Sequence, residues 1–111
     1  MAMIEIRFEG QLTPESLGAR LETANKDLAR YAASPHVDIL VDTLGMTGYE
    51  GDARNAFVGW FKDRKARFRK VGIVSNKLAW HIAINTMALA SGVKMKPFDS
   101  QAAAKQWLEQ P

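Results

Sequence analysis

Apolar and polar residues follow one another along the chain in short segments that predict strands and helices in alternation. Residues 3–8 alternate with a period of two, the pattern of a half-buried strand, and we expect Gly10 to end it. Thr13 and Pro14 then predict the N-cap and first residue of a helix, which Pro35 terminates. The apolar face of this helix is predicted to contain Leu17, Leu21, Ala24, Leu28 and Tyr31.

The rest of the chain repeats this order of strand and helix. Residues 37–41 and 71–74 are almost entirely apolar, which is typical of strands covered on both faces. A glycine-bearing loop leads from the first of them into a helix over roughly residues 52–69. The later segments predict a helix over 77–91, a strand over 93–98, and a short helix ending at Trp107 and Leu108.

This βαβαβαβα order predicts a single α/β domain over residues 1–111. Strands joined by helical crossovers run parallel, and right-handed connections place the helices over the sheet. We therefore expect a sandwich in which a mostly parallel four-stranded sheet is covered by four helices.

Composition excludes several classes of protein. The chain has no cysteine, so it has neither a disulfide nor a thiolate zinc site. Residues 1–5 lack the basic flank and apolar run of a signal peptide, and no uncharged apolar run reaches the roughly 20 residues of a membrane span. We therefore expect a cytoplasmic protein without a transmembrane segment.

Charge is divided unevenly along the chain. Residues 1–61 hold five Lys or Arg against nine Asp or Glu, whereas residues 62–111 hold ten against three. On the predicted second helix, Lys62, Lys65 and Arg69 lie away from an apolar arc, and we expect them to bind an acidic protein surface or anionic lipid headgroups. No reader motif accompanies them, which argues against nucleic acid. The residues of the apolar arc, which we expect in the core, are Ala53, Phe57, Trp60, Phe61 and Phe68.

The predicted third helix carries two apolar stripes, and a helix on a sheet buries only one of them. The first stripe is Leu78, Ile82 and Leu89, and the second is Trp80, Ile84 and Met87. We expect the first stripe in the core, so that Ile82→Ala costs about 2–5 kcal/mol. The second must meet the neighbouring helix, a partner subunit or an apolar ligand. We expect a two-fold homodimer contact, with Ile84→Glu leaving a folded monomer.

Polar side chains are predicted at the carboxyl ends of three strands, where open α/β sheets bind ligands. They are Asp42 and Thr43, Ser75 and Asn76, and Asp99 and Ser100. Such a cluster can bind a polar ligand or a divalent ion. The same residue types are the usual helix caps at βα junctions, and we favour that interpretation. We predict no metal site and no cofactor.

The predicted loop over residues 43–51 is rich in glycine and precedes a helix, as phosphate-binding loops do. It has neither a G-x-G-x-x-G pattern nor the lysine of a P-loop, which argues against a nucleotide site. Asp42, Thr43, Thr47 and Tyr49 remain candidates for a polar ligand site or for modification in this loop.

Catalytic chemistry has little support in the sequence. His36 and His81 lie in different elements without the spacing of a metal site. There is also no G-x-S-x-G nucleophile motif and no cysteine nucleophile. We expect a protein that is not an enzyme.

Three stretches resemble the STAS domains, and among them the SpoIIAA-like branch. They are residues 37–42 with the loop that follows, residues 71–76, and residues 93–99 with the Ala104-Lys105-Gln106-Trp107-Leu108 segment. The resemblance spans nearly the whole chain. It implies a SpoIIAA-like α/β sandwich, which is similar in shape to the CRAL-TRIO lipid-binding domains.

The resemblance also implies a function, because STAS domains are regulatory or scaffold modules that include bacterial anti-sigma factor antagonists. The phosphorylated serine of sporulation-type antagonists lies in an Asp-Ser-Ser-Gly turn. Here that position reads Tyr49-Glu50-Gly51-Asp52, so we do not expect a phosphoserine switch. We predict a non-catalytic regulatory or scaffold module that binds protein. The alternative is a carrier or sensor of a lipid or other apolar ligand, bound between the second and third helices.

Overall fold

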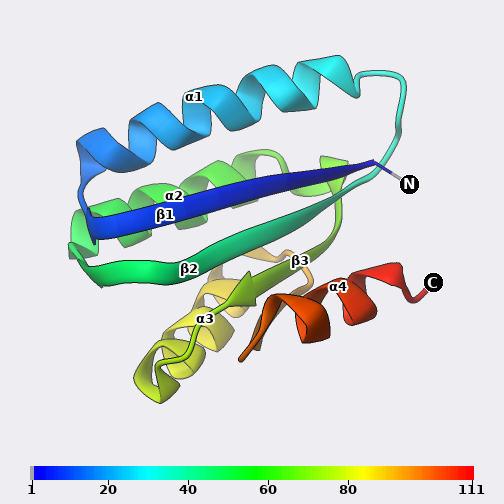
Figure 1. The fold of residues 1–111 in the computed structure, drawn as a ribbon. Helices are drawn as coiled ribbons and strands as arrows, with labels where there is room; N and C mark the ends of the chain where they lie inside the picture. Colours follow the sequence, from blue (N-terminus) through cyan, green and yellow to red (C-terminus); the bar gives the residue numbers. More distant parts are fainter. Residues whose placement is uncertain (1) are drawn as a thin grey trace.

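The computed structural model describes residues 2–111 and has the predicted alternation of four strands and four helices (Figure 1). The strands are β1 (Met3–Leu12), β2 (Val37–Tyr49), β3 (Phe68–Val74) and β4 (Met95–Phe98). The helices are α1 (Pro14–Arg30), α2 (Gly51–Asp63), α3 (Leu78–Ser91) and α4 (Gln101–Glu109), and a single 3-10 turn (Lys65–Arg67) joins α2 to β3. The predicted fold class is confirmed.

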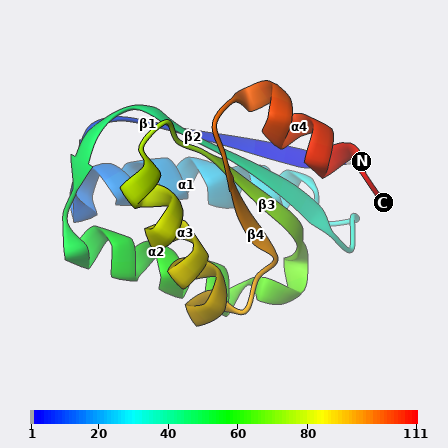
Figure 2. The ribbon, with the colours of Figure 1, turned by 90° about the horizontal axis from the view of Figure 1, so that it is seen from below.

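The sheet is parallel throughout, and its strands lie in the order β1-β2-β3-β4. Each strand therefore neighbours the next one in sequence, and the sheet grows in one direction only. Right-handed crossovers in one direction place their helices on one face of a sheet. Accordingly α1, α2 and α3 cover one face, whereas α4, which follows the last strand, covers the other (Figure 2).

Each face of the sheet has its own core. The larger core lies under α1, α2 and α3, and it contains all five residues of the apolar arc predicted on the second helix. Aromatic rings make up much of this core; the Phe57 ring centroid lies 4.7 Å from Phe61 and 5.4 Å from Phe8. The first helix also begins as predicted, because the Thr13 hydroxyl accepts a hydrogen bond from the Ser16 amide.

The smaller core joins α4 to the centre of the sheet. It consists of Leu40, Val74, Ala104 and Leu108. Gly72 in β3 lies directly beneath α4, since a Cβ atom there would be in van der Waals contact with the Ala104 Cβ, at 3.4 Å. Helix α4 covers β2, β3 and β4, and the outer face of β1 is exposed.

The first two strands are longer than predicted. Gly10 does not end β1, and the predicted glycine-rich loop is instead the second half of β2. Gly10 has a φ of +68°, and the pairing of β1 with β2 shifts register just before and just after it. These bulges absorb the irregularity, so the strands stay paired as far as Leu12 and Tyr49. The interpretation of these glycines as a loop signal was therefore wrong.

The second helix is shorter than predicted, because it ends at Asp63 rather than near residue 69. Phe68 and Arg69 belong to β3, where Phe68 pairs with Val37 of β2. Pairing along the sheet overrides the helical periodicity that placed both residues on one helix. Arg69 therefore does not share a helix face with Lys62, and the predicted cationic helix face is corrected.

Helix α3 has the opposite orientation to the predicted one. Leu78, Ile82 and Leu89, expected in the core, are 79%, 68% and 88% exposed. The second stripe, expected on the surface, is turned inward: Ile84 and Met87 are buried and Trp80 is half-buried. It packs against α2 and the extended end of β2, which is the neighbouring-helix alternative. The predicted dimer contact through Trp80, Ile84 and Met87 is therefore wrong.

The orientation of α3 predicts opposite effects for two isoleucines one half-turn apart. Ile84→Ala should lower the free energy of unfolding by about 2–5 kcal/mol, because it hollows the core. In protein dilute enough to be monomeric, Ile82→Ala should change it by no more than about 0.5 kcal/mol, because Ile82 is exposed in the single domain. Urea unfolding of both variants measures the difference. A larger loss for Ile82→Ala would contradict the orientation.

Candidate functional site

The exposed side of α3 is the most unusual surface of the molecule. We call Leu78, Ile82 and Leu89 the α3 face; they run along the helix from its first residue to its last turn. No Asp, Glu, Lys or Arg occurs between Leu78 and Ser91, and the exposed residues beside the face are uncharged. The exposed polar residues Asn85 and Thr86 lie between Ile82 and Leu89, so the face is uncharged but not wholly apolar. Single exposed aliphatic residues are ordinary, but three large ones on one side of an uncharged helix are typical of a contact surface.

Contacts at the first turn of α3 hold this face outward. Trp80 packs edge-on against Tyr49 of β2, with ring centroids 5.6 Å apart. Lys77 lies 4.2 Å from the centre of the Trp80 ring and donates a hydrogen bond to the Met46 carbonyl at 3.0 Å. On the other side His81 Nε2 lies 2.6 Å from the Ser75 carbonyl oxygen. The helix is thus tied to the ends of two strands.

A small apolar cavity lies behind α3, between this helix, α2 and the ends of β1 and β2. Its volume is about 60 Å³, and Tyr49, Phe57, Trp80, Ile84 and Met87 contribute to its walls. Pockets for small organic ligands measure about 300–1,000 Å³. The cavity lies where the apolar-ligand alternative requires it, but a lipid chain would enter only if α3 moved.

The polar residues at the strand ends are occupied by contacts within the fold. The Thr43 hydroxyl donates to the Val74 carbonyl at 2.6 Å. Asp42, on the opposite face of the sheet, accepts hydrogen bonds from the Leu44 amide and the Gln101 side chain. Ser100 caps α4 as predicted, because its hydroxyl accepts from the Ala103 amide.

The remaining members of that predicted cluster do not converge on a ligand. The Ser75 hydroxyl accepts from the Lys77 amide just before α3, which has no side-chain cap, so the predicted cap at Ser75 or Asn76 is wrong. Among the candidate modification residues, Tyr49 is half-buried and Thr47 is exposed. Within residues 2–111 no group of three acidic or histidine side chains could hold a metal ion, and no buried side-chain polar atom lacks a hydrogen-bond partner.

The basic run between α2 and β3 does not form one free surface. Arg64 lies over the Trp60 ring, and Arg67 donates to the Tyr31 carbonyl at 3.0 Å. Arg69 points to the other face of the sheet. Lys62 and Lys65 are the members of the predicted partner-binding trio that stay exposed.

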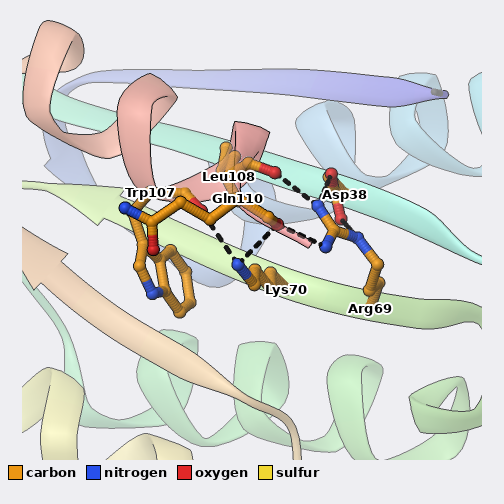
Figure 3. Close-up of polar contacts among 6 residues, drawn as sticks. All are labelled: Asp38, Arg69, Lys70, Trp107, Leu108 and Gln110. Carbon is orange, nitrogen blue, oxygen red and sulfur yellow. Dashed lines mark hydrogen bonds and ion pairs between the residues drawn. The ribbon is translucent and has the colours of Figure 1, made fainter.

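Arg69 and Lys70 instead hold the end of α4 (Figure 3). The Arg69 guanidinium forms two hydrogen bonds with the Asp38 carboxylate, at 2.9 and 2.7 Å, and also donates to the carbonyls of Leu108 and Gln110. Lys70 donates to the carbonyls of Trp107 and Gln110, both at 2.9 Å. The last carbonyls of a helix lack partners within it and carry partial negative charge, so two cations stabilise them.

The electrostatics of these two cations differ. The hydrogen bonds with Asp38 raise the pKa of Arg69. Burial lowers the pKa of Lys70, and repulsion from Arg69 and Lys94 adds to the effect. Sequence reasoning missed this cluster, although one signal was present: Asp38 interrupts an apolar strand, and a buried carboxylate requires a cationic partner.

Comparisons with other proteins agree with this geometry. A family model described as SpoIIAA-like matches residues 3–109. Among solved structures, a protein of the DUF3478 family from Shewanella loihica PV-4, with a SpoIIAA-like fold, superposes with a TM-score of 0.70. The two share 19% identity, over 94% of this chain and 81% of the other, so the likeness shows the fold alone. No curated protein matches the chain. Within residues 2–111, no helix is both long and apolar enough to cross a bilayer.

The Asp38–Arg69 pair is expected to contribute strongly to stability. Arg69→Met should lower the free energy of unfolding by about 3–5 kcal/mol, because it leaves the Asp38 carboxylate buried without its partner. Arg30→Met is the matched control: the Arg30–Asp27 pair lies on the surface, and its loss should cost less than about 1 kcal/mol. Equal losses in urea unfolding would show that the buried pair has no special role.

Proposed function

This chain belongs to the SpoIIAA-like family, and we propose that it acts by binding another protein rather than by catalysis. In this proposal it is a regulatory or scaffold module, and its working surface is the α3 face. The observation that carries the proposal is the exposure of Leu78, Ile82 and Leu89 on a helix without a charged Asp, Glu, Lys or Arg side chain.

Energetics favour covering this face. Each large aliphatic side chain removed from water contributes about 1.5–3 kcal/mol at full burial. The inward side of α3 is already packed against Tyr49 and the core. The α3 face is therefore available to a partner without any rotation of the helix. A partner that covers the α3 face therefore adds apolar burial without disturbing the domain.

A second copy of the chain is the partner that best fits this surface. The α3 face carries large apolar residues near both ends of the helix, so two copies related by a two-fold axis would place apolar residues against apolar residues. No like charges on the face would oppose this contact. The predicted homodimer is thus retained as a proposal, with its contact moved to Leu78, Ile82 and Leu89.

Sedimentation equilibrium tests the contact. The wild-type protein should be dimeric at micromolar concentration, and Ile82→Glu should be monomeric, because a buried unpaired carboxylate at the contact is costly. Ala102→Glu places the same charge on an exposed residue of α4 and should leave the dimer intact.

Thermal melting separates loss of contact from loss of fold. Ile82 is exposed in the single domain, so Ile82→Glu should remain folded and cooperative in melting. A wild-type protein that is monomeric at every concentration would overturn the proposed self-association. So would a dimer that survives Ile82→Glu unchanged.

The apolar-ligand alternative makes a different prediction. A cavity of about 60 Å³ holds no lipid chain, so native mass spectrometry of the purified protein should give the mass of the polypeptide alone or of its dimer. A stoichiometric apolar adduct would favour the carrier. Ala83 lines the cavity, so Ala83→Phe would narrow it. Loss of the adduct in this variant would place the bound ligand behind α3.

A further inference from the structure

A second surface, which unlike the α3 face is positively charged, lies on the opposite face of the sheet, between β4 and α4. Here the ammonium groups of Lys70, Lys94 and Lys96 surround the ring of Trp107, at 4.9, 6.0 and 5.7 Å from its centre. Lys94 and Lys96 are exposed, Trp107 is half-buried, and Phe98 packs against the indole at 5.4 Å. We call these residues the Trp107 cluster.

The lysines of this cluster form no salt bridge within residues 2–111. Asp38, whose charge attracts Lys70, is itself bound to Arg69. Repulsion from Lys94 and Lys96 contributes to the lowered pKa of Lys70, after burial and Arg69. Like charges held this close raise the energy of the free protein, and a bound anion would relieve that repulsion.

The backbone of β4 indicates how a partner would bind. The Lys94 carbonyl accepts a hydrogen bond from Val71 of β3 and the Phe98 carbonyl accepts one from Ser75, just after β3, so Met95 and Pro97 direct their backbone groups outward. Pro97 has no backbone N–H, so the edge of β4 cannot form the full set of hydrogen bonds with an added strand. Recognition must therefore use side chains. Lys94, just before β4, and Lys96, within it, lie two residues apart, which on extended backbone is about 7 Å along the chain.

We propose that the Trp107 cluster binds an acidic segment of a protein partner, whose carboxylates reach Lys94 and Lys96 while its apolar stems lie against Trp107 and Phe98. Lys70 supplies positive charge beneath these residues and does not contact the partner, because it is buried and donates to the carbonyls of Trp107 and Gln110. Nucleic acid fits less well, since Lys70 and Phe98 already lie against the indole ring on which a base would stack.

Fluorescence anisotropy with labelled octaglutamate tests this surface. Binding to the wild-type protein should be measurable at low salt and should weaken as salt is added. Lys94→Gln/Lys96→Gln should weaken it about 3- to 10-fold at low salt, as the loss of two surface ion pairs implies. The matched control is Lys62→Gln/Lys65→Gln, which removes the same charge from another exposed site and should weaken binding less than about twofold.

Three results would overturn the proposal. The first is that octaglutamate does not bind the wild-type protein. The second is that both double variants lose the same affinity, which would reduce the effect to net charge. In the third, oligothymidylate binds more tightly than octaglutamate and depends on Lys94 and Lys96, which would identify a nucleic-acid surface. Ile82→Glu should leave octaglutamate affinity unchanged, because α3 covers the other face of the sheet, so this proposal and the self-association proposal fail separately.

Discussion

Consecutive strands of this sheet are always neighbours, and that constraint determines where every helix lies. With right-handed connections, three successive crossovers must pack on one face, and the last helix alone is free to cover the other. Helix α3 is the last of the three and lies near the β4 edge, so it has neighbours on one side only. Helix α4 lies alone on its face of the sheet among the described residues, and Arg69 and Lys70 bind its final carbonyls.

The two proposed surfaces follow from this arrangement. The outer side of α3 has nothing to pack against within the domain, and it carries three large apolar residues and no charge. The β4 edge carries lysines and a proline, which protect an edge strand from adding another. One surface therefore suits a contact driven by apolar burial, and the other suits recognition of charge. Because they lie on opposite faces of the sheet, both can be engaged at once.

Sequence patterns predicted the elements whose two sides differ in polarity. The first helix has a distinct apolar face, and Leu17, Leu21, Ala24 and Leu28 are buried as expected. Helix α3 has no such difference, since both of its sides are apolar, so periodicity could not determine which one faces inward. The inward side of α3 packs against Tyr49, which lies at the end of the unexpectedly long β2. That part of β2 exists because it pairs with β1 past the bulges near Gly10, and such pairing between distant segments is not visible in local sequence patterns.

The orientation and self-association of α3 can be tested together by thiol labelling, because the chain has no cysteine of its own. Ile82→Cys and Ile84→Cys would each be labelled over a range of protein concentrations. We predict that Ile82→Cys reacts rapidly in dilute protein and more slowly as concentration rises, whereas Ile84→Cys reacts slowly throughout. Faster labelling of Ile84→Cys, or an Ile82→Cys rate that does not depend on concentration, would contradict the account.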